Sequence, residues 1–443
     1  MIKKLNNDEN FRLSSFVFKL IGGVCMKRSV IVFTIGIVFI ASFMIANQVT
    51  ITFWEGMGGP LGKTLQTITS LFNKDNPNIN VELIFVGNGE QLDSKILAAA
   101  EAKDLPTMAQ AYPAWTAQLV YDGVVAPLES FPGFSEVENQ LYPAEVNLGR
   151  INGKVYALPF NQEIYVLYYR PNMLAEAGIN PPKTMEELQE DAKLLTIKQN
   201  GKTVRYGFAF RTNVMALTSV ALQFGGGTYV TQDGKITINS TGNVKALSFL
   251  VNLVKDGYAY ATPEYPDHEL TTSSVALLLG GGAWLPYDIS DIAGQRDGLK
   301  MVPVPYGPNK ETTPALKGED IIIFNTASSE QQAAAWKYIQ FLLSPTVQLY
   351  WTMQTDYSPI NKAVTGLDEW KLYVESSPYH PAPIGQGMQN AISETELLPW
   401  WPAVQLDIKT AVENAVSGIM TPQQALDWAQ QVAENIYQRY YLK

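Results

Sequence analysis

The chain has 443 residues, a formal net charge of −10, 46% hydrophobic residues and a single cysteine. No cluster of Lys and Arg lies outside the N-terminal segment, which argues against a nucleic-acid partner, because phosphates demand a basic surface. Single hydrophobic cores stop growing at roughly 250–300 residues, so we expect more than one lobe.

The N-terminal segment, residues 1–46, is predicted to be a leader. Two basic residues precede an apolar run over 30–46, which is the pattern of a secretory signal. The run is short for a membrane span of about 20 apolar residues. Ala46 suits the last leader residue, although Met44 is large for a small-residue position. We therefore predict an exported protein, periplasmic or at the cell surface, with a leader that is either cleaved or retained as a membrane tether.

After the leader, strands predicted over 49–54, 81–86 and 107–111 alternate with helices. The loops after such parallel strands converge on one sheet edge, where ligands bind in open α/β folds. The glycine-rich loop 55–62 lacks the spacing of a P-loop, but a helix start there can hold an anion or a hydroxyl, and a plain flexible turn is the equal alternative. Trp115 suits either helix packing or a platform for a sugar ring. The candidate ligand-binding residues of this part are Glu55, Glu90 and Trp115.

The segment 159–188 contains a strand, two turns and a helix in close succession. Its apolar run over 164–169 indicates a buried strand, entered through a turn at Pro159. A Pro-Pro turn and Thr184 then begin a capped helix that is expected to extend to residue 199. Glu163 directly precedes the predicted strand.

The remaining sequence continues the alternation of strands and helices. A strand over 204–210 ends at Arg211, a strand over 274–279 ends in a glycine turn, and a strand over 320–325 returns the chain to the first lobe. A helix is predicted over 403–417. The candidate ligand-binding residues that the sequence itself supplies in this part are Glu163, Arg211, Asp320, Trp400 and Trp401.

Enzyme chemistry has little support in the sequence. The two histidines, His268 and His380, lie far apart, and neither GxSxG nor HExxH occurs. Cys25 is the only cysteine, and translation from Met26 would leave it out. The protein would then have neither disulfides nor a catalytic thiol. Paired carboxylates for glycoside hydrolysis stay open, because any two acids can meet in space. We expect a binding protein with no metal and no cofactor; an exported glycosidase is the remote alternative.

Several short segments occur in an informative order: ITFWE at 51–55, GNGEQ at 87–91, QAY at 110–112, LYY at 167–169, AGI at 177–179, PPKT at 181–184 and TPQQALD at 421–427. This order resembles the extracellular solute-binding proteins of carbohydrate ABC importers, the maltose-binding-protein superfamily, and most of all their glycerol-3-phosphate-binding branch. The resemblance implies an α/β fold of the type II periplasmic-binding-protein kind, in which two lobes enclose a ligand cleft at a hinge of several strands.

The resemblance implies roles for particular residues. It places the segment 159–188 at the crossover between the lobes, with Glu163 at the hinge, facing the cleft. It also implies that Trp284, after its glycine turn, and Tyr357 are candidate ligand-binding residues.

The resemblance also implies a division of the chain and a set of partners. The first lobe would comprise 47–160 and 317–362, and the second lobe 161–316 and 363–443, with hinges near 159–163, 316–320 and 358–366. We expect a monomer that binds a carbohydrate or polyol and delivers it to the permease subunits of an ABC transporter.

The residues and the resemblance favour different ligands. The glycerol-phosphate branch has a tyrosine where this chain has Gly89, a glutamate where it has Pro113, and an arginine near 396–401. The missing tyrosine is expected to enlarge the pocket, and the missing arginine removes the group that best pairs with phosphate. We therefore expect a sugar or short oligosaccharide. Glycerol-3-phosphate or a glycerophosphodiester is the alternative, because Arg211 and the glycine-rich helix start can hold a phosphate.

Overall fold

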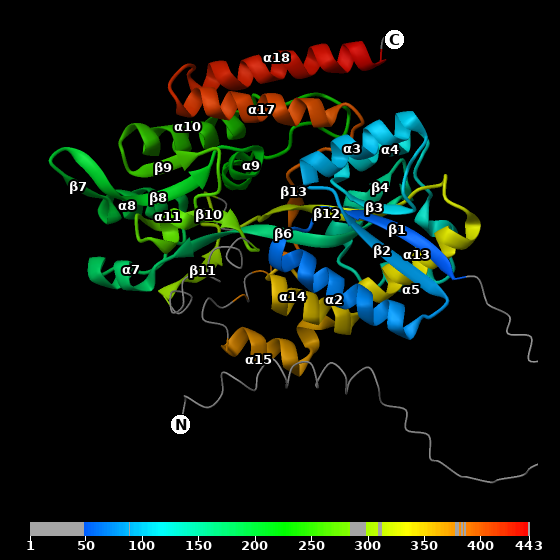
Figure 1. Ribbon diagram of the computed structural model, residues 1–443. Helices are drawn as coiled ribbons and strands as arrows, with labels where there is room; N and C mark the ends of the chain where they lie inside the picture. Colours follow the sequence, from blue (N-terminus) through cyan, green and yellow to red (C-terminus); the bar gives the residue numbers. More distant parts are fainter. Residues whose placement is uncertain are drawn as a thin grey trace, which may run out of the picture. The chain divides into compact units, whose positions relative to one another are not determined.

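One mixed sheet runs through the part of the chain that the computed structural model describes, residues 48–87, 89–283, 298–308, 312–376, 381, 384 and 387–441. Its 11 strands follow the order β2-β1-β3-β12-β6-β10-β8-β7, with β11 beside β6, β13 beside β12 and β9 beside β8. Helices lie on both sides of this sheet (Figure 1). The α/β class predicted from the sequence is therefore confirmed.

The first half-sheet consists of β1 (Val49–Glu55), β2 (Ile79–Phe85) and β3 (Met108–Ala111), with β1 parallel to both neighbours. Its connections are α2 (Gly59–Asp75), α3 (Gly89–Ala102) and α4 (Pro113–Tyr121). Helix α2 begins four residues before the predicted helix, since Pro60 fits a first helical turn. Helix α4 likewise begins at once after β3, so Trp115 lies on a helix and not in a loop.

Two long strands join the halves of the sheet. Strand β6 (Ala157–Tyr169) pairs with β12 (Ala315–Ile323) through its first part and with β10 and β11 through its last part. The turn predicted at Pro159 is therefore wrong, because the strand is continuous there. The register shifts between Glu319 and Asp320, and proline is tolerated in a strand at such irregularities.

The second half-sheet contains β7 (Ile197–Gln199), β8 (Lys202–Arg211), β9 (Ala259–Thr262), β10 (Val275–Gly281) and β11 (Lys300–Pro303). Helix α8 (Met185–Leu195) precedes it and begins with a capping box between Thr184 and Glu187. The predicted continuation of this helix to residue 199 is wrong, because β7 leaves the helix and pairs with β8.

The remaining elements connect and cover the two half-sheets. They are α5 (Phe134–Glu138), α6 (Pro143–Val146), β4 (Arg150–Ile151), β5 (Lys154–Val155), α7 (Pro171–Ala177), α9 (Val214–Gln223), α10 (Thr241–Lys255), α11 (Asp267–Thr271), α13 (Ser329–Leu342), α14 (Pro345–Thr355), α15 (Asp368–Ser376), β13 (Ile392–Ser393), α17 (Trp401–Val416) and α18 (Pro422–Tyr441). Among the described residues, none of these helices combines the length and the apolar character that crossing a membrane requires.

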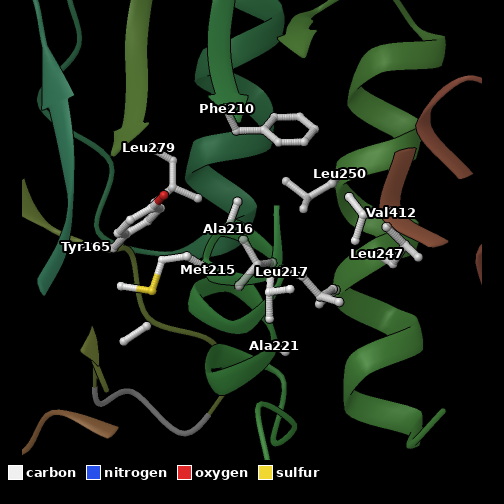
Figure 2. Packing of buried hydrophobic residues seen from close by; sticks show 14 of the residues in the cluster. Tyr165, Phe210, Met215, Ala216, Leu217, Ala221, Leu247, Leu250, Leu279 and Val412 are labelled. Carbon is white, nitrogen blue, oxygen red and sulfur yellow. The ribbon is translucent and has the colours of Figure 1, made fainter. Parts of the chain in front are cut away.

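Each half-sheet has its own large core. Helices α2, α13 and α14 pack on the first half-sheet, around Phe53, Tyr338 and Trp351. The second core lies around α9, where Leu217 and Ala221 meet Leu247 and Leu250 of α10 (Figure 2). Helices α17 and α18, drawn in orange and red in Figure 1, complete this second core although they come last in the chain.

Candidate functional site

A cavity of about 560 Å³ lies where the two half-sheets meet. Tyr112 and Pro113, which follow β3, line it, and so does Arg211, the last residue of β8. Helix α17 and the β12 residues Lys317 and Gly318 supply further wall. The carboxyl end of a strand from each half-sheet thus reaches the same hollow, and ligands in α/β folds usually bind outside the carboxyl ends of strands.

A chain of buried hydrogen bonds runs beside this cavity and joins four strands or their loops. The Gly56 N–H donates to Gln110 Oε1 at 2.9 Å, Gln110 Nε2 donates to Asn161 Oδ1 at 2.9 Å, and Asn161 Nδ2 donates to Glu319 Oε2 at 3.0 Å. These residues follow β1 or lie on β3, β6 and β12, so the chain fixes both long strands to the first half-sheet.

Glu319 ends this chain as a buried acid, with 3% of its surface exposed. Burial raises the pKa of its carboxyl group to about 7, against the opposing effects of the Asn161 hydrogen bond and the charge of Lys317. The carboxyl group therefore changes charge near neutral pH, unlike an ordinary surface glutamate.

Two further buried acids lie at the same crossing. Gln162 Nε2 donates to Asp320 Oδ1 at 2.8 Å, and the Ser358 N–H donates to the Gln162 carbonyl oxygen at 2.9 Å. Glu145 of α6 is fully buried, and its two carboxyl oxygens accept no hydrogen bond from the described residues. Burial raises the pKa of Glu145 and Asp320 well above the usual range and so favours the neutral form of both groups.

Cationic groups on the cavity wall are largely engaged by the protein itself. Lys317 Nζ lies 3.7 Å from Glu394 Oε1 and 5.4 Å from the centre of the Tyr112 ring. Burial alone would lower the pKa of Lys317, but nearby carboxylates, Glu394 first, outweigh it and raise the pKa. Arg211 donates from Nε to the Pro263 carbonyl at 2.8 Å.

Two of the residues selected from the sequence, Trp115 and Arg211, line the cavity. Glu163 lies beside it in register with Lys317, and its Oε2 accepts a hydrogen bond from the Ala283 N–H at 3.1 Å. Glu55 is buried at 3% exposure and accepts from the Met57 N–H at 2.5 Å; burial raises its pKa. Glu55 and Asp320 therefore support the crossing and do not line the cavity.

The structure places three predicted aromatic residues away from the cavity wall. Trp400 and Trp401 are 3% and 0% exposed and pack in the second core, Trp401 on Tyr229 and Trp400 on Tyr437. No ring face is open for a sugar on either tryptophan. Tyr357 stacks on Trp351, with ring centres 6.0 Å apart.

Two predicted residues cannot be placed in the same way. Trp284 lies outside the described residues, and so does the side chain of Glu90, whose backbone begins helix α3. The room expected beside Gly89 is occupied, because a Cβ atom there would stand 2.2 Å from Glu319 Oε1 and 2.5 Å from Tyr112 Cε2. The absence of a side chain at Gly89 thus leaves no open space directly beside its Cα atom.

Sequence reasoning missed several residues of the wall, among them Tyr112, Lys317, Glu394 and Lys409. Tyr112 had a signal, since it directly follows a predicted strand. Lys317 precedes the strand predicted over 320–325, and its pairing with β6 arises only from the tertiary fold. Among the described residues, no group of three or more His, Cys, Asp or Glu side chains is placed to hold a metal ion.

The raised pKa of Glu319 predicts a pH-dependent stability. Between pH 4.5 and about 7 the folded chain keeps a proton that the unfolded chain releases, so the free energy of unfolding falls as pH rises through this window. Glu319→Gln removes this loss, because glutamine does not titrate. Between pH 4.5 and 8, the free energy of unfolding of the variant relative to the wild type should therefore rise by at most about 3 kcal/mol. Urea unfolding at several pH values measures the difference.

Glu101 is exposed on helix α3, so the variant Glu101→Gln is the control for the loss of one negative charge. Its stability curve should run parallel to that of the wild type. Parallel stability curves for the wild type and Glu319→Gln would show that Glu319 is not protonated in the folded state.

The chain is similar in sequence to solute-binding proteins. The family model described as bacterial extracellular solute-binding protein matches residues 67–377. The sn-glycerol-3-phosphate-binding periplasmic protein UgpB of Escherichia coli strain K12 is 24% identical over 419 residues, which cover 88% of this chain and 93% of that protein.

Two solved structures illustrate the similarity of the fold. UgpB from Mycobacterium tuberculosis, in complex with glycerophosphocholine, matches with a TM-score of 0.78 at 20% identity, over 88% of this chain and 99% of that chain. The sugar-binding protein MalE from Xanthomonas citri matches with a TM-score of 0.76 at 21% identity, over 89% and 99%. The type II, two-lobed α/β fold predicted from the resemblance is thereby confirmed.

Proposed function

The chain belongs to the bacterial extracellular solute-binding protein family, and from this premise we propose that it is the receptor of an ABC importer for a neutral sugar or a short oligosaccharide. Its relatives are solute-binding proteins and not enzymes, and we propose the same for this chain. The ligand would bind in the cavity at the meeting of the two half-sheets and then be delivered to the permease.

The observation that carries this ligand class is the composition of the cavity wall. Tyr112 and Trp115 offer rings beside polar groups, the combination that binds the apolar and hydroxylated faces of a sugar. The charge of Lys317 is balanced by Glu394 at 3.7 Å. Glu163 and Glu394 can accept hydrogen bonds from hydroxyl groups, whereas they repel a phosphate.

We propose that two lobes close over the ligand. The first would comprise 47–160 and 317–362 and the second 161–316 and 363–443, with hinges near 159–163, 316–320 and 358–366. The separate cores of the two half-sheets support this division. So does the Gln162 contact with Asp320 and Ser358, which brings all three hinge segments together.

The partners and the location follow from the same proposal. The closed protein, as a monomer, would dock on the permease subunits of an ABC transporter. We propose no nucleic-acid partner. An exported protein agrees with the extracellular family. The predicted leader over 1–46, cleaved or retained as a tether, lies outside the described residues.

Glycerol-3-phosphate or a glycerophosphodiester is the second candidate ligand. Three cationic residues, Arg211, Lys317 and Lys409, lie on the cavity wall. The named ligands of the two UgpB proteins, sn-glycerol-3-phosphate and glycerophosphocholine, are phosphate esters of this kind. These cations are the observation that favours the second candidate.

A thermal-shift panel separates the two candidates. We expect a mono- or oligosaccharide to stabilise the protein, by about 2.7 kcal/mol at a concentration of 100 Kd. The panel contains mono- and oligosaccharides, polyols, glycerol-3-phosphate and glycerophosphodiesters. Stabilisation by phosphate esters alone would reject the sugar proposal and leave the family membership intact.

The position of Trp115 predicts a direct role in sugar binding. Its loss in Trp115→Ala removes a stacking face, and binding of the saccharide identified in the panel should weaken by about tenfold, or 1.4 kcal/mol. Isothermal titration calorimetry measures the change. Trp428→Ala on α18, which does not line the cavity, is the control; equal losses in both variants would remove Trp115 from the site.

Lobe closure predicts compaction on binding. Small-angle X-ray scattering at saturating ligand should give a smaller radius of gyration than the ligand-free protein, because the hinge segments allow the two lobes to approach. An unchanged scattering curve at saturation would contradict closure.

A further inference from the structure

One buried carboxylate lies beside the start of a helix that borders the cavity. Helix α3, of 14 residues, begins at Gly89. A Cβ atom on Gly89 would stand 2.2 Å from Glu319 Oε1 and 2.5 Å from the Tyr112 ring. Glu319 therefore occupies the space beside the first residue of α3.

The position of this carboxylate is fixed by the protein. Asn161 Nδ2 donates to Glu319 Oε2 at 3.0 Å, and Asn161 is itself held by Gln110 at 2.9 Å. Only 3% of the surface of Glu319 is exposed. A ligand cannot displace this side chain without breaking the hydrogen bonds that join β3, β6 and β12.

This arrangement has a consequence for charged ligands. Helix N-termini attract anions through their free N–H groups and the helix dipole. Here the protein supplies that anion itself. Lys317, the nearest cation, is paired with Glu394 at 3.7 Å. A phosphate near the start of α3 would therefore meet the negative charge of Glu319, while the charge of Lys317 is balanced by Glu394.

We propose that Glu319 is a specificity-determining residue that disfavours anionic ligands in the cavity and so favours neutral polyhydroxylated ones. This inference rests on the proposed function, since it assigns the ligand selectivity of the same cavity. Glu319 does not line the cavity itself. It acts on a bound ligand through its negative charge.

The charge of Glu319 depends on pH, so its effect on the binding of anionic ligands should depend on pH as well. Burial raises its pKa to about 7. The groups that act on it are Lys317 on its own strand and Glu55 at the end of β1, and the hydrogen bond from Asn161 of β6 favours its charged form. Burial raises the pKa of Tyr112 and of Asp320, and the charge of Glu319 adds to both shifts. The repulsion of an anionic ligand should accordingly grow as pH rises through 7.

The test compares two probes by isothermal titration calorimetry at pH 5.5 and pH 8. One is the neutral saccharide that stabilises the wild type most in the thermal-shift panel. The other is sn-glycerophosphoglycerol, whose phosphodiester keeps one negative charge over this range. For Glu319→Gln at pH 8, the affinity ratio of phosphodiester to saccharide should rise by at least about tenfold over the wild type. At pH 5.5 the two proteins should differ much less.

The exposed Glu101→Gln, on the same helix α3, controls for the change in net charge and should leave the ratio as in the wild type. An unchanged ratio in Glu319→Gln, or wild-type affinity for the phosphodiester that does not fall between pH 5.5 and pH 8, would overturn the inference.

The two proposals fail in different ways. If no saccharide binds the wild type, the proposed function fails, and the affinity of Glu319→Gln for the phosphodiester still tests Glu319 alone. If Glu319→Gln unfolds, the pH dependence of the wild type provides the test, because a purely structural residue would not make phosphodiester binding depend on pH in this direction.

Discussion

The pairing of β6 with β12 is the constraint on which the rest of the structure depends. These two strands alone pass between the half-sheets within the described sheet order, and they carry residues of both cores. Backbone groups at their crossing are buried and must be paired. The side chains of Asn161 and Gln162 complete this pairing by binding Glu319 and Asp320. Any motion of the lobes has to pivot about these contacts.

Burying acids at a crossing is costly unless they are hydrogen-bonded or protonated. The protein uses both solutions. Glu319 and Asp320 accept hydrogen bonds from Asn161 and Gln162. Glu145 accepts none from the described residues, and burial raises its pKa and so favours its neutral form. Each raised pKa lowers stability at neutral pH relative to acid pH. A uniformly apolar crossing would avoid this cost, so the acids indicate that the crossing has a role besides holding the lobes together.

Local patterns predicted the elements, and long-range contacts decided the site. The capping box at Thr184 and the strand at 49–54 follow from neighbouring residues, and both are present in the structure. The sequence could not predict that Trp400 would be covered by Tyr437, because that contact joins α17 to a residue one helix later. Likewise, Lys317 became part of the cavity wall only through the strand pairing of β12 and the approach of Glu394.

The balance of charge at the cavity explains how an acidic protein with cations on its wall can suit a neutral ligand. Lys317 is balanced by Glu394, and the Nε of Arg211 is used by the Pro263 carbonyl. Glu319 adds a negative charge beside the start of helix α3, which would otherwise attract anions. Hydroxyl groups both donate and accept hydrogen bonds, so they can satisfy carboxylates and N–H groups in turn. A phosphodiester group only accepts hydrogen bonds, so it offers no donor to the carboxylates of this wall.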